Sequence, residues 1–153
     1  MRPRDPRTEP PLKTAVLPFI SVIVPYLNQS DQLRACLRSL EMQDYPGDRF
    51  EVIVVDNGSR DATMEIARAA GARVLRCEAR GVARARQMGL EAVQTDWVAS
   101  TDADSLPAPH WLEVLNEAAP GHTALYGPMR FPGVPRHWAL ASGASYKIGR
   151  AHV

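Results

Sequence analysis

Residues 97–105 read Trp-Val-Ala-Ser-Thr-Asp-Ala-Asp-Ser, an apolar start followed by two carboxylates one residue apart. This pattern is typical of a buried strand whose carboxyl end opens into a site. Because unpaired buried charge is very costly, Asp102 and Asp104 need a partner, and hard divalent cations take carboxylate oxygens. The alternative is a strand that runs into a solvated acidic turn with Ser105 and Pro107, and this stretch alone favours neither interpretation.

Length and composition describe an ordinary globular domain. The chain has 153 residues, 45% of them hydrophobic and 23% charged, which is enough for one domain with a core. The net charge of +1 gives no electrostatic reason to expect a nucleic-acid partner. Cys36 and Cys77 lie far apart without metal-ligand spacing, which favours reduced thiols in the cytoplasm or at the cytoplasmic face of a membrane. The sequence contains no apolar run of about 18 residues that would predict a transmembrane helix.

Strand-like apolar runs alternate with helical patterns along the chain. The predicted strands cover residues 19–25, 50–55, 73–77 and 97–101. The predicted helices are one through Leu33, Leu37 and Leu40 with Ser30 or Asp31 as its cap, one over 62–70, one over 81–95 and one over 108–119. In the helix over 81–95, the residues expected to face inward are Val82, Ala85, Met88, Gly89, Ala92 and Val93. The alternation predicts an α/β fold, with a mostly parallel sheet and helices on both faces.

Three polar clusters follow predicted strands: residues 25–28, residues 56–59 and residues 102–104. Because ligands of parallel sheets bind beyond the carboxyl ends of the strands, these clusters are expected to form one site. No G-x-G-x-x-G follows the first strand and no P-loop motif is present, which disfavours dinucleotide dehydrogenases and P-loop enzymes.

The chemistry of these clusters suits a nucleotide with a diphosphate. Asp56 and Asn57 offer acceptors and an amide for a base or ribose, and a metal on Asp102 and Asp104 can bridge two phosphates. Arg84 and Arg86 lie early in a predicted helix and can meet phosphate oxygens, although a solvated helix face is the alternative for each. Two residues apart, they point to different sides of the helix, and Arg84 is the preferred candidate.

Four motifs, taken in order and at their distances, resemble a known family. SVIVPYLN, EVIVVDNGSRDAT, GVARARQMGL and STDADS look like the nucleotide-binding half of family-2 glycosyltransferases, which have the Rossmann-like GT-A fold, and the resemblance covers residues 19 to about 127. It implies a D-x-D element at residues 102–104, with Asp102 and Asp104 holding Mg²⁺ or Mn²⁺. The nucleotide-sugar site that it implies comprises Pro25, Tyr26, Asn28, Asp56, Asn57, Ser59, Arg84, Asp102 and Ala103. Many relatives carry a second acid where this chain has Asn57, which leaves the identity of the base open. Gln87 stands where relatives often have Asn, a mild change.

The resemblance implies metal-dependent transfer of a sugar from a nucleotide-diphosphate sugar, first of all a UDP-sugar, to an acceptor hydroxyl with inversion. The family's carboxylate base comes from a later segment; Glu113 and Glu117 are better explained as solvated helix acids, so no base is assigned. Two alternatives stay open. One is a fragment that binds nucleotide sugar without transferring it. The other, less favoured, is a sugar nucleotidylyltransferase, which needs a Gly-rich phosphate loop that residues 25–28 do not supply.

The two ends of the chain look different from its middle. Residues 1–18 are rich in proline and arginine and are expected to form a disordered arm. Residues 19–147 are expected to form the nucleotide-sugar-binding domain, incomplete at its C-terminus, with a short strand at 125–127 and a helix beginning near His137. Residues 148–153, Ile-Gly-Arg-Ala-His-Val, resemble a translated sequencing-library adapter, which predicts a truncated reading frame with a foreign tail. Sugar, acceptor, oligomeric state and any membrane anchor of the full-length protein are not specified by this sequence.

Overall fold

The computed structural model describes residues 16–95, 97–125 and 148–150. Within them, a central sheet has the strand order β3-β2-β1-β4-β6-β5. Its first four members are mutually parallel: β1 (Ile20–Tyr26), β2 (Phe50–Asp56), β3 (Arg73–Arg76) and β4 (Trp97–Ser100). The short strand β6 (Ile148–Arg150) runs antiparallel to β4 and to β5 (Ala124–Leu125). The prediction of a mostly parallel sheet is confirmed.

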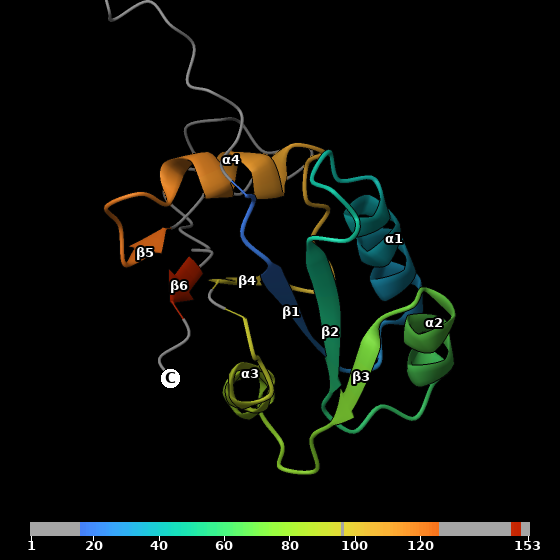
Figure 1. The fold of residues 1–153 in the computed structure, drawn as a ribbon. Helices are drawn as coiled ribbons and strands as arrows, with labels where there is room; N and C mark the ends of the chain where they lie inside the picture. The colour runs from blue at the N-terminus through green and yellow to red at the C-terminus, as the bar shows by residue number, and fades with distance from the viewer. Residues whose placement is uncertain (1–15, 96, 126–147, 151–153) are drawn as a thin grey trace, which may run out of the picture.

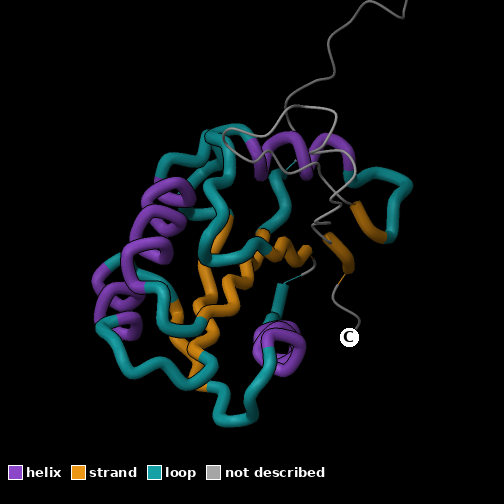
Figure 2. Tube along the Cα trace, turned by 180° about the vertical axis from the view of Figure 1, so that it is seen from behind, coloured by secondary structure: helices purple, strands orange, loops and turns teal. Residues whose placement is uncertain are grey.

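Helices cover both faces of the sheet, as the sequence predicts. The helices α1 (Ser30–Glu41), α2 (Thr63–Ala69) and α4 (Trp111–Ala118) contribute to one apolar cluster, and α3 (Val82–Glu91) packs in a second one. Figure 1 shows α3 on the opposite side of the strands from α1 and α2, and Figure 2 shows the same separation from behind. Since successive strand residues point to opposite faces, Val22 and Val24 join the first cluster while Ile23 joins the second.

The close approach of α3 to the sheet depends on Gly89. A Cβ atom built on this residue would lie 2.6 Å from Cγ2 of Ile23 in β1. Ala85, one turn earlier on the same helix face, is fully buried. Together these two small residues fix the rotation of α3 about its axis, and that rotation decides which of its other side chains face the carboxyl ends of the strands.

The structure corrects two local expectations. Neither Ser30 nor Asp31 caps α1, because the helix begins at Ser30 with no side-chain cap of its own; instead, Asp61 accepts the Ser30 N–H at 3.2 Å. Val82 is 53% exposed rather than inward, because it lies in the first turn of α3, before the helix meets the sheet.

Several predictions about the ends fall outside the described residues. These are the arm over residues 1–15, the part of the strand at 126–127, and the helix from His137. Residues 148–150 form β6, and the suggestion that 148–153 are foreign concerns the gene and stays a prediction. None of the helices among the described residues is long and apolar enough to cross a membrane.

Candidate functional site

A pocket of about 490 Å³ opens at the carboxyl ends of β1, β2 and β4. This volume lies within the range typical of small-molecule sites. All three polar clusters contribute to the pocket wall, and so does the start of α3. Its lining residues are Pro25, Tyr26, Leu27, Gln29, Asn57, Arg80, Gly81, Val82, Ala85, Arg86, Asp102, Ala103 and Asp104. The structure therefore brings the acidic pair and the loop after β2 together, as expected for one site.

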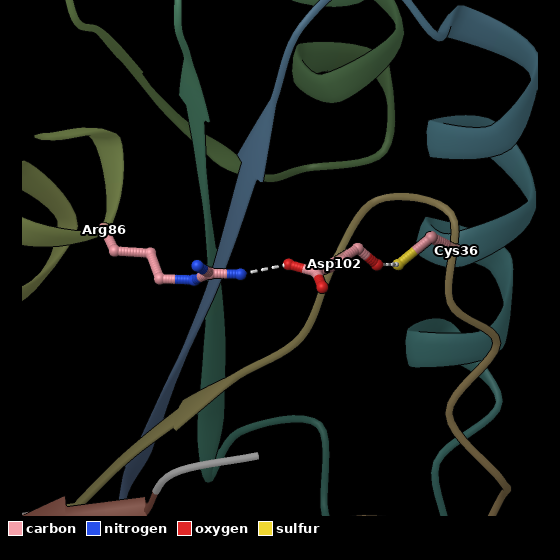
Figure 3. A network of polar contacts seen from close by, with 3 residues as sticks. All are labelled: Cys36, Arg86 and Asp102. Carbon is pink, nitrogen blue, oxygen red and sulfur yellow. Dashed lines mark hydrogen bonds and ion pairs between the residues drawn. The ribbon is translucent and has the colours of Figure 1, made fainter. Parts of the chain in front are cut away.

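The acidic pair occupies one wall of the pocket with an arginine beside it. Asp102 and Asp104 both line the pocket, and Ala103 between them is buried. Arg86 Nη2 donates a short hydrogen bond to Asp102 Oδ1 and forms an ion pair with it across the space between α3 and the loop after β4 (Figure 3). From the other side, Cys36 Sγ in α1 lies 3.7 Å from the main-chain oxygen of Asp102 and donates to it. Burial, and then the nearby charges of Asp104 and Asp102, raise the pKa of the Cys36 thiol to about 12, so the thiol stays protonated.

The donor set fits Mg²⁺ or Mn²⁺ shared with a phosphate ligand. No group of three or more His, Cys, Asp or Glu side chains that could hold a metal occurs among the described residues. The described side chains alone therefore do not form a closed metal cage. Mg²⁺ instead keeps several waters and binds through one or two carboxylates plus substrate phosphates, and Asp102 and Asp104 supply that number.

Asn57, which is 6% exposed, stabilises the loop after β2. Its Nδ2 donates to the main-chain oxygens of Cys77 at 3.3 Å and Ala79 at 2.8 Å, and its Oδ1 accepts the Gly81 N–H at 2.8 Å. Both amide hydrogens are thus used within the protein. Asn57 lines the pocket and at the same time fastens the segment that leads into α3.

Asp56 and Ser59 shape the same loop from behind the wall. Asp56 is fully buried and does not line the pocket; its Oδ1 accepts the Ser59 N–H at 2.9 Å. Its other oxygen, Oδ2, is buried without a hydrogen-bond partner among the described residues. A buried carboxylate oxygen without a partner is unfavourable, so this acceptor calls for a donor that the described residues do not supply.

The loop after β1 is joined to the loop after β2 by reciprocal hydrogen bonds. Asn28, with a positive φ of 52°, accepts the Arg60 N–H through Oδ1 at 3.0 Å and donates its own N–H to Ser59 Oγ at 3.1 Å. Asn28 does not line the pocket; its neighbours Leu27 and Gln29 do. Its role in this structure is to join the two loops that form the pocket wall.

Tyr26 and Asp61 form a second connection between these loops. The Tyr26 hydroxyl donates to Asp61 Oδ2 at 2.8 Å and accepts the Gln29 N–H. Burial raises the pKa of Tyr26 to about 12, and the hydrogen bond to Asp61 adds to that rise. Asp61 also accepts hydrogen bonds from the main chain and hydroxyl of Thr63. Tyr26 is therefore a neutral, fixed part of the wall.

The two arginines of α3 differ in their placement. Arg86 lines the pocket, whereas Arg84 is exposed and is not among its lining residues. The sequence thus favoured Arg84, which the structure places outside the pocket. Arg80, Gly81 and Val82 were also missed, although Val82 and Arg86 stand four residues apart and share one helix face, which is a signal that the sequence contains.

The chain is similar to known proteins in sequence and in structure. The family model described as Glycosyl transferase family 2 matches residues 21–151. "Glycosyltransferase AglE" of Haloferax volcanii is 39% identical over 106 residues, which cover 65% of this chain and 35% of AglE. The structure of S. aureus TarS 1-349 in complex with UDP matches with a TM-score of 0.69 at 25% identity, over 87% of this chain and 47% of that one. The mannosyltransferase PcManGT from Pyrobaculum calidifontis, in complex with GDP-Man and Mn²⁺, matches with a TM-score of 0.65 at 32% identity, over 75% of this chain and 36% of that one.

The chain spans about a third of the length of the curated relatives that it matches. The resemblance carried by its four motifs is confirmed by the family match. Because that match covers most of the chain and the structural neighbours share its sheet and flanking helices, the chain belongs to glycosyl transferase family 2 and has the Rossmann-like GT-A fold.

Proposed function

We propose that this chain forms the donor-binding part of an enzyme that transfers a sugar from a nucleotide-diphosphate sugar to an acceptor hydroxyl, with metal dependence and inversion at the anomeric carbon. The observation that carries the proposal is the meeting of Asp102, Asp104, Arg86 and Asn57 in one pocket at the strands' carboxyl ends. Carboxylates for a cation, a guanidinium for phosphate and a fixed polar loop are what a nucleoside diphosphate requires.

The diphosphate end of the ligand is assigned to the wall formed by α3. Gly81 and Val82 at the start of α3 line the pocket, and the first turn of this ten-residue helix contains no acidic residue. Free N–H groups and the positive end of the helix dipole favour phosphate there. Arg80 and Arg86 add two cationic side chains. When bound on Asp102 and Asp104, Mg²⁺ or Mn²⁺ neutralises charge on the leaving diphosphate.

The nucleoside end is assigned to Pro25, Tyr26 and Asn57, which line the same pocket at the ends of β1 and β2. Asp56, whose buried Oδ2 has no partner among the described residues, is assigned to the same end as an acceptor for an N–H of the base or for a bridging water. Two structural neighbours were solved with UDP and with GDP-Man, which supports a nucleoside diphosphate as the shared ligand class. A UDP-sugar is the first donor to test.

The decisive experiment is calorimetric titration of the chain with UDP in the presence and in the absence of Mn²⁺. Wild-type protein is expected to bind UDP with Mn²⁺ and much more weakly with EDTA. Asp104→Ala should lose the metal-dependent part of the binding, because one of two carboxylate ligands is removed. Glu113→Ala, which removes an exposed acid from α4 outside the pocket, is the matched control and should bind like wild type. Unchanged affinity in Asp104→Ala would contradict the proposed site.

A donor-hydrolysis assay on the same preparations separates transfer from binding alone. If wild type releases UDP from a UDP-sugar and Asp104→Ala does not, the result supports a donor site that also activates the leaving group. Tight binding without turnover supports a binding unit that needs residues elsewhere for the reaction. No general base is assigned among the described residues, and the acceptor is left to activity screening.

A further inference from the structure

The ion pair between Arg86 and Asp102 occupies an oxygen that the proposed metal site also needs. Arg86 approaches from α3 and meets Oδ1 of Asp102 (Figure 3). Asp104 lines the same pocket and is exposed. A divalent cation and a guanidinium carry like charges and repel each other when both bind this carboxylate. Binding of a cation at Asp102 must therefore displace Arg86 or be weakened by it.

We propose that Arg86 is an exchangeable internal counter-ion, held by Asp102 in the ligand-free protein and transferred to the diphosphate when metal and nucleotide bind together. This inference rests on the proposed function and adds to it a coupling between the two ligands. Metal alone binds weakly because Arg86 competes for Asp102. A nucleoside diphosphate removes that competition, since its oxygens offer Arg86 a new bidentate partner within the same pocket.

Partial exposure of the ion pair lowers the free-energy cost of the exchange. The side chains of Arg86 and Asp102 are 40% and 42% exposed, so water already solvates both charges in part. Exposed ion pairs are weak, and a ligand that supplies a comparable partner can replace one. Because coupling between two ligands is reciprocal, metal must raise the affinity for the nucleotide by the same factor as the nucleotide raises the affinity for metal.

The first test measures Mn²⁺ binding to the whole chain without nucleotide, by the loss of the free-ion electron paramagnetic resonance signal. Arg86→Ala is expected to bind Mn²⁺ about two- to fivefold more tightly than wild type, the range that an exposed ion pair allows. A merely structural role of Arg86 would not produce tighter metal binding. Arg34→Ala, which removes an exposed arginine of α1 that does not line the pocket, controls for the change in net charge.

The second test repeats the titration with saturating UDP. In wild type, UDP should tighten Mn²⁺ binding strongly, and in Arg86→Ala this enhancement should fall by about the same two- to fivefold, because saturating UDP already draws Arg86 away from Asp102 in wild type. Arg86→Lys, which keeps the charge but not the fork geometry, should lie between the two. Exchange therefore predicts two results in Arg86→Ala: tighter binding of Mn²⁺ alone and a smaller enhancement of that binding by UDP.

Three results would overturn the inference: Mn²⁺ affinity without nucleotide that is unchanged or weaker in Arg86→Ala, an equal gain in Arg34→Ala, or a gain in Arg84→Ala instead. Absence of measurable Mn²⁺ binding in wild type and Arg86→Ala alike also counts against it. Failure of the proposed function looks different, because wild-type protein would then bind no UDP with or without Mn²⁺, whatever Arg86 does to metal alone.

Discussion

Replacement of Asn57 by aspartate tests whether this side chain holds the pocket together. The change keeps the shape and size of the residue, and it keeps an oxygen that accepts the Gly81 N–H. It removes both N–H donors to the main-chain oxygens of Cys77 and Ala79. In their place, a carboxylate oxygen would face two carbonyl oxygens in a buried environment. Asn57→Asp is therefore expected to destabilise the fold through this single loop.

The magnitude follows from the hydrogen bonds that are lost. Two bonds at about 0.5–1.5 kcal/mol each, together with the cost of leaving two carbonyls facing an anion, give a loss of about 3 kcal/mol near neutral pH. A loss of this size is a large fraction of the stability of a typical domain. Asn57→Ala, which loses all three bonds without adding a charge, is expected to lose a similar amount.

The pH dependence separates this explanation from a general defect. The carboxyl that replaces Asn57 has its folded-state pKa raised by burial and by the two carbonyls, above the unfolded value of about 3.9. Because the folded-state pKa is the higher of the two, the variant is most stable below the unfolded-state pKa. It loses stability as the pH rises through the folded-state pKa. The protonated acid also regains one donor for Ala79. The deficit relative to wild type should therefore be smallest near pH 4 and largest at about pH 7.

Urea unfolding followed by circular dichroism at several pH values measures this difference. Asn116→Asp makes the same substitution at a half-buried position in α4 and is expected to change the free energy of unfolding by at most about 0.5 kcal/mol. A deficit in Asn57→Asp that matches this control, or one that does not change with pH, would refute the role assigned to the Asn57 amide.

Two further outcomes are expected from the packing and from the loop connections. Gly89→Ala should lower the free energy of unfolding by about 1–2 kcal/mol, because the clash with Ile23 outweighs the gain in helix propensity. Gly47→Ala, where nothing lies within 4 Å of the new Cβ, is the control in the same urea experiment. Desolvation alone would raise the pKa of Asp61, but hydrogen bonds from Thr63 and Tyr26 hold it below its ordinary value. The stabilisation by ionised Asp61 is therefore present above its unfolded-state pKa and is lost as the pH falls through its folded-state pKa. The difference in free energy of unfolding between wild type and Asp61→Asn should therefore shrink on acidification.

The sheet could be predicted from the sequence because its strands are contiguous apolar runs. The stretches at 19–25 and 50–55 contain enough β-branched residues to be recognised locally, and each ends in polar residues at the edge where ligands bind. The acidic pair was found for the same reason, since it follows its strand directly. Such features depend on neighbours in sequence, and local patterns report them well.

Which arginine of α3 lines the pocket could not be predicted in this way. Arg84 and Arg86 lie about 200° apart around α3, and the choice between them depends on how the helix is rotated against the sheet. That rotation is set by the contact of Gly89 with Ile23, residues 66 positions apart in the sequence. The loop contacts of Asn57 and Asp61 could not be predicted for a related reason, because their partners come from loops that only the folded sheet brings near.

The two sides of the pocket are built from different kinds of interaction, and this difference has a consequence for binding. The side formed by Asn57 rests on neutral, largely buried hydrogen bonds, whose loss would leave main-chain groups without partners, so it is ordered before the ligand arrives. The side formed by Asp102 and Arg86 rests on an exposed ion pair, whose members find other partners at little cost. In the proposed complex, a nucleoside would meet a preformed wall, which saves the entropy of ordering it. The diphosphate and its metal would meet an ion pair that can rearrange, so the proposed coupling between them is concentrated at Arg86.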